Sequence, residues 1–444
     1  MNSDLHAVRE HQLWNDGIVS SSKPGHSQSS SAKRSRIKKI VTEAAGLLHA
    51  PQRAFPLAGI LLSHRIRRST ELRHLYSYAI TKRESSAVLN LVVRWILAAQ
   101  CADGGVPAYY SLLTGYSKSY PEVTGYLIPT LYDFAKSCED SIVTTAAERA
   151  TRWLLSLQMP EGAFPGGLQG DSGQASIFNT GQILRGLTRA YREIHDPVIA
   201  GAAIAAADWL VEVQRPDGSW SGPGAYQGGA HTYYSMVSWA LAEVSKEVGD
   251  PKYGEAAERN LNWTLSYFRP TGWIDGINLE GHVDYLHFIA YVLQGGLECA
   301  MLRDRNDAIE AAAESAWLLL RRFETNKCLR GAYERDFKNG RYFSCLTGNA
   351  QMSCVWLRLF EVTGDLRYFN AALKMNEMLK RLIPVHGGPG ITGGVSGSYP
   401  IWGGYQPLRY ISWGSKFFAD ALLNEQRLKA CFVTSECEAL ECAS

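Results

Sequence analysis

The chain has 444 residues, and hydrophobic side chains make up 46% of them, which is enough to build a large core. Lys and Arg number 45 against 43 Asp and Glu, a near-balance that argues against a nucleic-acid binder. No apolar run reaches the roughly 18 residues of a transmembrane helix. The N-terminus lacks the apolar segment of a secretory signal, and the nine cysteines form no CxxC pair, so we expect reduced thiols, no structural zinc and a cytoplasmic location.

Four regions follow one another along the chain. Residues 1–40 are polar, rich in serine and then in Lys and Arg, which predicts a disordered basic tail. Residues 41–84 have the pattern of one or two helices that pack on the main body. The body spans 85–425, and 426–444 read as a C-terminal tail without a clear structural signal.

An internal repeat runs through the body. Tryptophan recurs near the end of successive helical patterns at Trp95, Trp153, Trp209, Trp263 and Trp317. The first three patterns end in a glutamine, at Gln100, Gln158 and Gln214, and a glycine-containing turn follows. After each turn comes an irregular loop of about 15–20 residues, long enough to carry function.

A second, more apolar helix follows each loop. A small residue recurs near its start, at Gly125, Gly181, Ser235, Ala290, Gly348 and Gly414, and would let these helices approach closely. The sixth first-type helix, 366–382, lacks the tryptophan, as terminal repeats often do. Six such pairs account for 85–425 and predict an all-α fold, an (α/α)6 toroid of six helix hairpins with the second helices inside.

The run from Gln214 to Trp220, Gln-x-x-Asp-Gly-x-Trp, resembles the repeat motif of squalene–hopene cyclases and protein prenyltransferase β subunits. The resemblance implies the α/α-toroid superfamily, which also includes many glycoside hydrolases, polysaccharide lyases and a domain of glucuronyl C5-epimerases. The Asp-x-Asp-Asp acid of the cyclases and the Asp-Asp-x-x-Asp box of ionising terpene synthases are absent. The resemblance therefore indicates the fold and says little about the reaction.

The loops that lead into the inner helices interleave aromatic residues with carboxylates, which suits sugar rings and their hydroxyls better than a hydrocarbon. The alternative is that the aromatic rings only fill the mouth of the barrel. The residues expected to bind substrate are Tyr120, Asn179, Trp220, Tyr233, Trp273, His287, Tyr399, Tyr405 and Arg409.

Glu122, Asp284 and His231 are the predicted catalytic residues. Glu122 and Asp284 stand at the starts of the first and fourth inner helices, which lie opposite each other in a ring of six. Glycoside hydrolysis needs two carboxylates flanking the bond. A lyase or an epimerase instead needs a base and, for a uronate, a neutralising group, for which His231, Tyr120 and Arg409 are available. Hydrolase, lyase and epimerase thus stay open.

The sequence gives weaker evidence for a metal site and for a reactive thiol. His282, Asp284 and His287 lack a familiar metal-ligand spacing, so we expect no metal and no cofactor. Cys345 at an inner-helix start is either a nucleophile or an inert buried thiol. The favoured hypothesis is an enzyme acting on a polysaccharide or oligosaccharide, in the biosynthesis of a surface polysaccharide. The rivals are a terpenoid-cyclase-like enzyme with an altered acid, and a non-catalytic toroid that binds glycan or protein.

Overall fold

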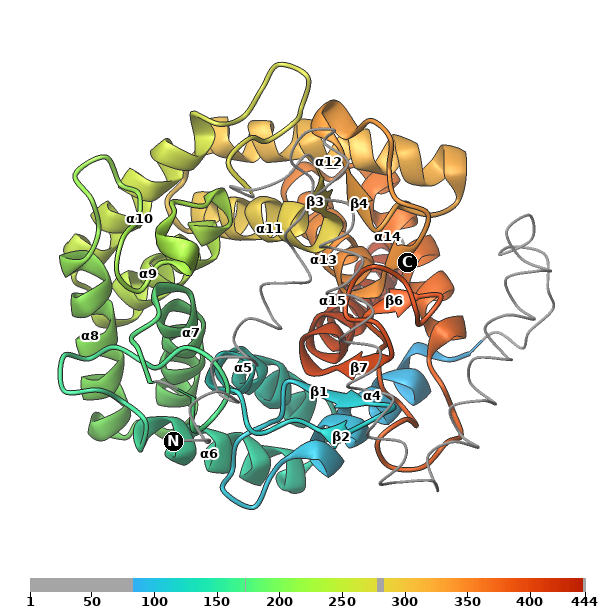
Figure 1. Cartoon of the computed structure of the whole chain (residues 1–444). Helices are drawn as coiled ribbons and strands as arrows, with labels where there is room; N and C mark the ends of the chain where they lie inside the picture. Colours follow the sequence, from blue (N-terminus) through green and yellow to red (C-terminus); the bar gives the residue numbers. More distant parts are fainter. Residues whose placement is uncertain (1–82, 172, 278–282, 442–444) are drawn as a thin grey trace, which may run out of the picture.

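The computed structural model describes residues 83–171, 173–277 and 283–441, with side chains as far as 431. Helices in this part of the chain form two concentric rings (Figure 1). The outer ring consists of α4 (Ser85–Ala99), α6 (Ser141–Leu155), α8 (Pro197–Glu212), α10 (Pro251–Leu265), α12 (Asn306–Asn326) and α14 (Leu366–Leu382). The inner ring consists of α5 (Pro121–Cys138), α7 (Ile177–Ile194), α9 (Ser235–Val248), α11 (Leu286–Leu302), α13 (Leu346–Thr363) and α15 (Ser412–Glu441).

The inner helices close on themselves. They pack in the order α5, α7, α9, α11, α13 and α15, and α15 returns to pack on α5. The predicted (α/α)6 toroid of six helix hairpins is therefore confirmed. Because α5 and α11 are three places apart in this ring of six, they lie on opposite sides of the axis (Figure 1).

The repeated glutamines hold the outer ring together. Gln158 Nε2 donates to Gly162 O in its own turn (3.0 Å) and to Ala202 O on the next outer helix (2.8 Å). Gln100 and Gln214 make the same two kinds of bond. Gly162 has φ +94°, and a Cβ there would lie 2.3 Å from a carbonyl oxygen of α8, so only glycine fits. The motif that resembles cyclases and prenyltransferases therefore serves the fold.

Small residues bring the inner helices together, as predicted. A Cβ on Gly125 would lie 2.6 Å from Ile183 Cα, and one on Gly186 would lie 2.3 Å from Gly125 O. The backbones of α5 and α7 therefore touch at a distance that no larger residue permits.

Aspartates begin four of the outer helices. Their carboxylates accept hydrogen bonds from backbone N–H groups of the first turn, which otherwise have no partner. These N-cap residues are Asp140, Asp196, Asp250 and Asp365. Their positions repeat with the helix pairs, so the starts of these four outer helices are set locally.

Short antiparallel strands tie the loops together at one end of the ring. β1 (Tyr109–Ser111) pairs with β2 (Gly115–Tyr116) and with β7 (Arg409–Ile411) of the last loop. β3 (Asp284–Tyr285) pairs with β4 (Ala332–Tyr333), and β5 (Ser344–Cys345) pairs with β6 (Ser398–Tyr399). The sequence did not indicate these strands, because two or three residues show no alternation. Three short 3-10 helices complete the loops: η2 (Tyr226–Gly228), η3 (Thr232–Tyr234) and η4 (Arg335–Phe337).

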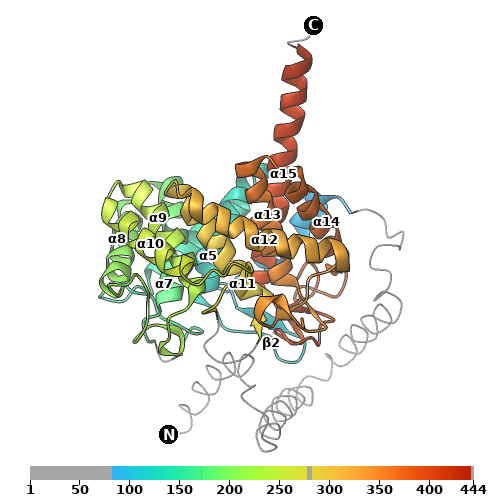
Figure 2. The same cartoon turned by 90° about the horizontal axis from the view of Figure 1, so that it is seen from above.

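The first described helix, α4, starts at Ser85, and the last one ends beyond the predicted body. Helix α15 continues through 426–441, which the sequence assigned to a C-terminal tail, and it projects from the ring (Figure 2). The basic tail 1–40 and nearly all of the predicted helical segment 41–84 lie outside the described residues.

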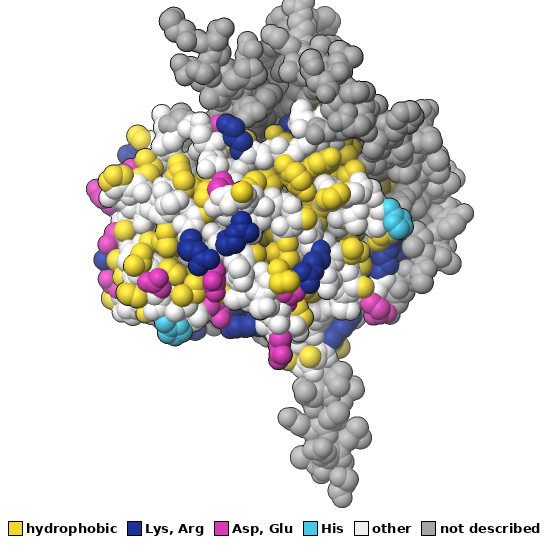
Figure 3. All heavy atoms as spheres, turned by 90° about the horizontal axis from the view of Figure 1, so that it is seen from below, with side chains coloured by type: hydrophobic (Ala, Val, Ile, Leu, Met, Phe, Trp, Pro, Cys, Tyr) yellow, Lys and Arg dark blue, Asp and Glu magenta, His cyan; other side chains and the backbone are white. Residues whose placement is uncertain are grey.

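The outer surface carries both signs of charge. Figure 3 shows basic and acidic side chains mixed across one face of the described part of the ring. The described cysteines carry free thiols: Cys101, Cys138, Cys299, Cys328, Cys345, Cys354 and Cys431. Among the described helices, none combines the length and the apolar character that a membrane span requires.

Candidate active site

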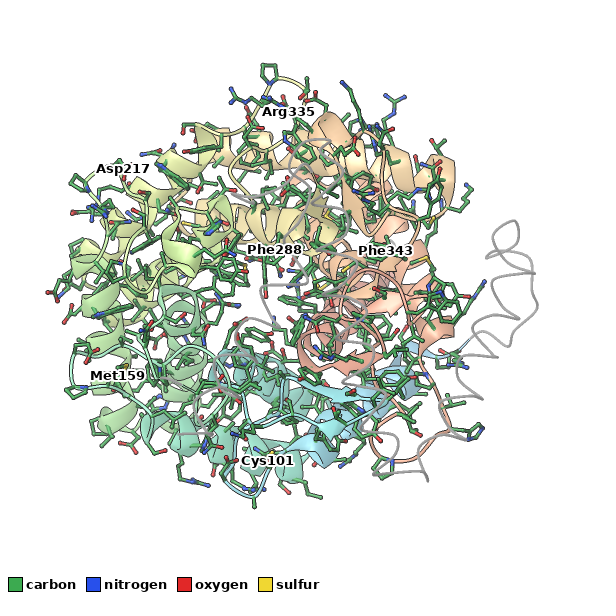
Figure 4. The ribbon with its side chains drawn as sticks, viewed as in Figure 1. Cys101, Met159, Asp217, Phe288, Arg335 and Phe343 are labelled. Carbon is green, nitrogen blue, oxygen red and sulfur yellow. The ribbon has the colours of Figure 1, made fainter. Side chains whose placement is uncertain are left out.

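The inner helices start at the end of the ring where the loops and strands gather (Figures 1 and 2). The turns that precede the loops lie on the outer rim, where Figure 4 labels Cys101, Met159 and Asp217, whereas Phe288 lies on the inner side of α11. Side chains from the first turns of the inner helices therefore meet around the axis. The candidate site is built from them.

Glu122 occupies the first turn of α5, directly after Pro121. Its side chain is buried, with 4% of the residue exposed, and Tyr120 Oη donates a hydrogen bond of 2.5 Å to Glu122 Oε2. Burial raises the pKa of Glu122 to about 7, and the hydrogen bond from Tyr120 opposes the rise. A carboxyl with a pKa near neutrality can both give and take a proton, which is what general acid–base catalysis needs.

Five buried tyrosines surround Glu122. Burial is the main cause that raises the pKa of each of them, and the negative charge of Glu122 raises it further. They come from α5 and its N-cap, from η3, from α11 and from the last loop: Tyr120, Tyr126, Tyr233, Tyr291 and Tyr405. All five stay protonated at neutral pH, so each keeps a hydroxyl group that can donate a hydrogen bond.

An aromatic floor closes the axis beside these tyrosines. We use this name for Tyr126, Phe178, Tyr291 and Phe417, which lie on α5, α7, α11 and α15. Ring centroids are 5.3 Å apart for Phe178 and Tyr291, 5.8 Å for Tyr291 and Phe417, and 5.9 Å for Tyr126 and Phe417. Because helices that are not neighbours in the ring meet here, their side chains fill the axis at this level.

His287 packs against the aromatic floor, 4.2 Å from the Tyr291 ring. Its Nδ1 lies 2.6 Å from Gln351 Oε1. Because an amide oxygen can only accept, this bond assigns the proton to Nδ1 and leaves Nε2 as an acceptor. Burial lowers the pKa of His287 to about 3, so the ring is neutral under physiological conditions.

His231 is held by the backbone. Its Nδ1 lies 3.1 Å from Ile277 O and its Nε2 lies 3.0 Å from Tyr226 O. Burial lowers its pKa, while the two carbonyl oxygens oppose that shift. The ring stacks on Tyr233 at 4.8 Å. Since both nitrogens are engaged, His231 fits the role of holding Tyr233 in place better than that of a free base.

Both tryptophans of the predicted substrate-binding set lie in the core. Trp220 has no exposed surface, and its indole N–H donates to Leu210 O at 2.9 Å. Trp273 is 3% exposed and packs edge-on against Phe337, with centroids 5.0 Å apart. Neither ring offers a face to a sugar, so we remove both from the proposed substrate-binding set. The sequence could not separate core aromatics from axial ones, because both follow the same repeat.

The remaining predicted residues lie in the loops and first turns. Asn179 lies in the first turn of α7 and lowers the pKa of Tyr120, against the larger effect of burial. Tyr399 is buried in β6, and Asp284 is half-buried in β3, where it faces Tyr333. Arg409 Nη1 donates to Gln406 Oε1 at 2.9 Å, and its guanidinium covers the Tyr109 ring at 4.1 Å.

Several residues at the axis escaped sequence reasoning. Tyr126 and Tyr291 stand four residues after Glu122 and His287, a spacing that puts each pair on one helix face and could have revealed them. Gln182 is fully buried, and neither atom of its amide bonds to another described residue. Buried amides normally have partners, so Gln182 is free to bind a ligand or water.

Two further possibilities raised by the sequence are a metal ion and the thiol of Cys345. The described residues contain no cluster of three His, Cys, Asp or Glu side chains that could hold a metal ion, while His282 lies outside them. Burial raises the pKa of Cys345 to about 12, so this side chain is a neutral thiol. That state agrees with the inert reading of Cys345 and not with a nucleophile.

No protein-family model matches the chain, and no curated protein matches it in sequence. Solved structures, by contrast, match the fold of this chain. An unsaturated glucuronyl hydrolase specific for heparin has a TM-score of 0.64 at 16% identity, covering 78% of this chain and 98% of that one. An unsaturated glucuronyl hydrolase from Bacillus sp. GL1 has a TM-score of 0.62 at 16% identity, with 78% and 97% covered. A cellobiose 2-epimerase from Bacillus thermoamylovorans has 0.64 at 11% identity, with 78% and 98% covered. At this identity the likeness establishes the toroid fold.

Proposed function

We propose that this protein is a carbohydrate-active enzyme that acts on an oligosaccharide or polysaccharide, with Glu122 as its general acid–base. The observation that carries the proposal is a buried carboxyl with a pKa of about 7, hydrogen-bonded to Tyr120 at the start of the first inner helix. Burying such a group destabilises the folded protein at neutral pH, because burial disfavours the charged form of the carboxyl. Strongly shifted carboxyls of this kind concentrate at catalytic sites.

The surroundings of Glu122 support a sugar ligand. Tyrosine hydroxyls and the amide of Asn179, which lowers the pKa of Tyr120, offer donors and acceptors for sugar hydroxyls. Aromatic rings beside them suit the C–H faces of a pyranose. The structural neighbours are described as sugar hydrolases and sugar epimerases, which agrees with this ligand class. A terpenoid substrate would not call for this many hydrogen-bonding groups.

The aromatic floor limits how a glycan chain could enter the candidate active site. Because Phe178, Tyr291 and Phe417 meet across the axis, a glycan cannot pass through the ring between α5 and α11. A chain end would therefore enter from the loop side. We infer that the enzyme acts on a terminal sugar unit.

Two classes of reaction remain as candidates. Hydrolysis would use a second carboxylate, for which Asp284 on the opposite side of the ring is available. Proton transfer within the sugar, as in an epimerase or a lyase, would pair Glu122 with His287, whose Nε2 is an acceptor. Asp284→Asn separates these classes, because it should abolish hydrolysis and spare proton transfer.

The decisive experiment is Glu122→Gln. It keeps the shape of the side chain and removes its titrating proton, so turnover of an oligosaccharide that the wild type converts should fall about 100-fold or more. Binding measured by calorimetry should stay nearly unchanged. Glu148→Gln is the matched control, because Glu148 lies on outer helix α6 in an exposed pair with Arg152.

Other outcomes favour the rivals. Normal turnover in Glu122→Gln would leave this residue as an ordinary first-turn glutamate. Glycan binding without any wild-type turnover would favour the non-catalytic toroid, and binding of prenyl analogues without sugars would favour the terpenoid hypothesis. We place the activity in the cytoplasm, in the synthesis of a surface polysaccharide, because the described cysteines are all free thiols, as a reducing compartment keeps them.

A further inference from the structure

A line of aromatic rings leads from the candidate active site towards the loops of the last three repeats. It starts at Tyr405, one of the five tyrosines around Glu122, whose ring lies 5.5 Å from that of His287. The ring centroids of Tyr405 and Tyr285 are 5.3 Å apart, and those of Tyr285 and Phe343 are 6.3 Å apart. Successive rings along this line are therefore neighbours.

Exposure to solvent rises along this line. His287 and Tyr405 are buried, with 4% and 7% of each residue exposed, whereas Tyr285 and Phe343 are half-buried. Tyr285 lies in β3, and Phe343 directly precedes β5 and is labelled in Figure 4 near the start of α13. We call Tyr285 and Phe343 the aromatic platform. A chain whose terminal unit lies at the buried end of the line reaches the platform on its way to the solvent.

The neighbouring backbone holds the aromatic platform in place. A Cβ on Gly331 would lie 2.1 Å from Phe343 Cε2, and one on Gly404 would lie 2.8 Å from Phe343 Cε1, so only glycine lets the chain approach this ring so closely. Tyr285 Oη donates to Gly404 O at 3.2 Å, which ties the second ring to the same loop. Because both rings are fixed before a ligand arrives, binding to them costs little side-chain ordering.

Aromatic rings on other sides of the site have a face covered already. The Arg409 guanidinium lies over the Tyr109 ring at 4.1 Å. His231 stacks on Tyr233 at 4.8 Å, and Tyr233 is only 5% exposed. These rings are therefore poorly placed to stack on further sugar units, whereas the aromatic platform is half-buried and continuous with the site.

We propose that the aromatic platform binds the second sugar unit of a chain whose terminal unit meets Glu122, an inference that rests on the proposed function. The C–H face of a pyranose packs on the exposed part of the two rings, as apolar surfaces in ligand sites do. Tyr405 lies between the platform and the terminal unit. The chain then leaves the ring beside β3 and β5, on the side of the fourth to sixth repeats. The ligand is therefore an oligosaccharide of at least two units.

The test compares each methyl monosaccharide with the corresponding disaccharide, for gluco, galacto and manno units. Binding to the full-length protein is measured by ligand-observed NMR titration. In the wild type, the second unit of the preferred pair should improve the affinity about tenfold, which is the size of a single stacking contact between an aromatic side chain and a nucleic-acid base. Phe343→Leu and Tyr285→Leu should each lose most of this gain, because they keep apolar volume and remove the flat ring. Both should bind the methyl monosaccharide as the wild type does.

Tyr342→Leu is the matched control and should keep the gain. Tyr342 precedes Phe343 in the chain, but it is 83% exposed and Arg330 lies over its ring at 4.3 Å.

Three results would overturn the inference and leave the proposed function standing. The first is a wild type that gains nothing from the second unit. The second is a gain that both platform variants keep, because the rings would then only fill the mouth of the barrel. The third is loss of the methyl monosaccharide in both variants, because the rings would then support the site itself. If the wild type binds no member of any pair, the proposed function fails and the inference fails with it.

Discussion

Carboxylates of the inner helices have two opposite kinds of surroundings. In the first turn of α5, Glu122 is buried against tyrosines, with no described cation among the causes of its pKa. Further along the inner helices, three carboxylates have cations within 3.2 Å: Arg185 with Glu243, Arg358 with Glu298, and Lys416 with Asp420. Both regions bury charge, but only the second balances it.

This difference distinguishes carboxylates that stabilise the fold from a carboxyl that can exchange protons. A buried carboxylate that is paired has a cation to balance its charge, and the pair links neighbouring elements. A buried carboxyl without a cation shifts toward neutrality and becomes able to exchange protons. Within the described residues, the ring thus balances these three carboxylates with cations and leaves Glu122 without one.

The largest effect should come from breaking one of these ion pairs. Arg185→Leu leaves Glu243 partly buried without its cation and removes the stacking on Trp239. We expect the free energy of unfolding to fall by about 3–5 kcal/mol, measured by urea denaturation. Lys136→Ala is the control, because Lys136 pairs with Glu193 but is 64% exposed, and it should cost under about 1 kcal/mol. Similar losses in the two variants would erase the distinction between buried and exposed pairs.

Burial of Glu122 should make the free energy of unfolding fall as the pH rises. Its pKa is about 7 in the folded protein against 4.5 for an ordinary glutamate, so folding favours the protonated form. The stabilisation is complete below about pH 4.5 and is lost as the pH rises through about 7. Relative to Glu122→Gln, the wild type should therefore lose about 3 kcal/mol between about pH 4.5 and pH 8. Unfolding curves of both proteins across this range measure the difference in the free energy of unfolding. A difference that stays constant with pH would show that the pKa of Glu122 is not shifted.

A smaller effect concerns the hydrogen bond to Glu122. Tyr120→Phe removes the donor that opposes the rise in the pKa of Glu122, so that pKa should move up by about one unit, equivalent to about 1.4 kcal/mol. The corresponding limb of the pH–rate profile should move to higher pH. Tyr132→Phe is the control on the same helix, because the Tyr132 hydroxyl has no partner among the described residues. A shift in both variants, or in neither, would remove Tyr120 from the acid–base group.

The sequence by itself determined the architecture. The repeated tryptophans, the glutamine turns and the small residues at inner-helix starts follow from local rules of helix capping, turn geometry and close approach. These rules act within one helix pair and its neighbour, so a period of about 56 residues is enough to predict the ring. Glu122 could also be singled out, because a carboxyl after a proline at a helix start is visible in one dimension.

Only the tertiary structure decided which side chains surround that carboxyl. Trp220 and Tyr405 belong to similar aromatic loops, yet the first is fully buried in the core and the second faces Glu122 closely enough for the charge to raise its pKa. Tyr291 reaches the same place from the opposite side of the ring. Contacts across the axis join residues from repeats that are far apart in the sequence. Their burial and charge balance follow from the closed ring as a whole, and no local pattern contains them.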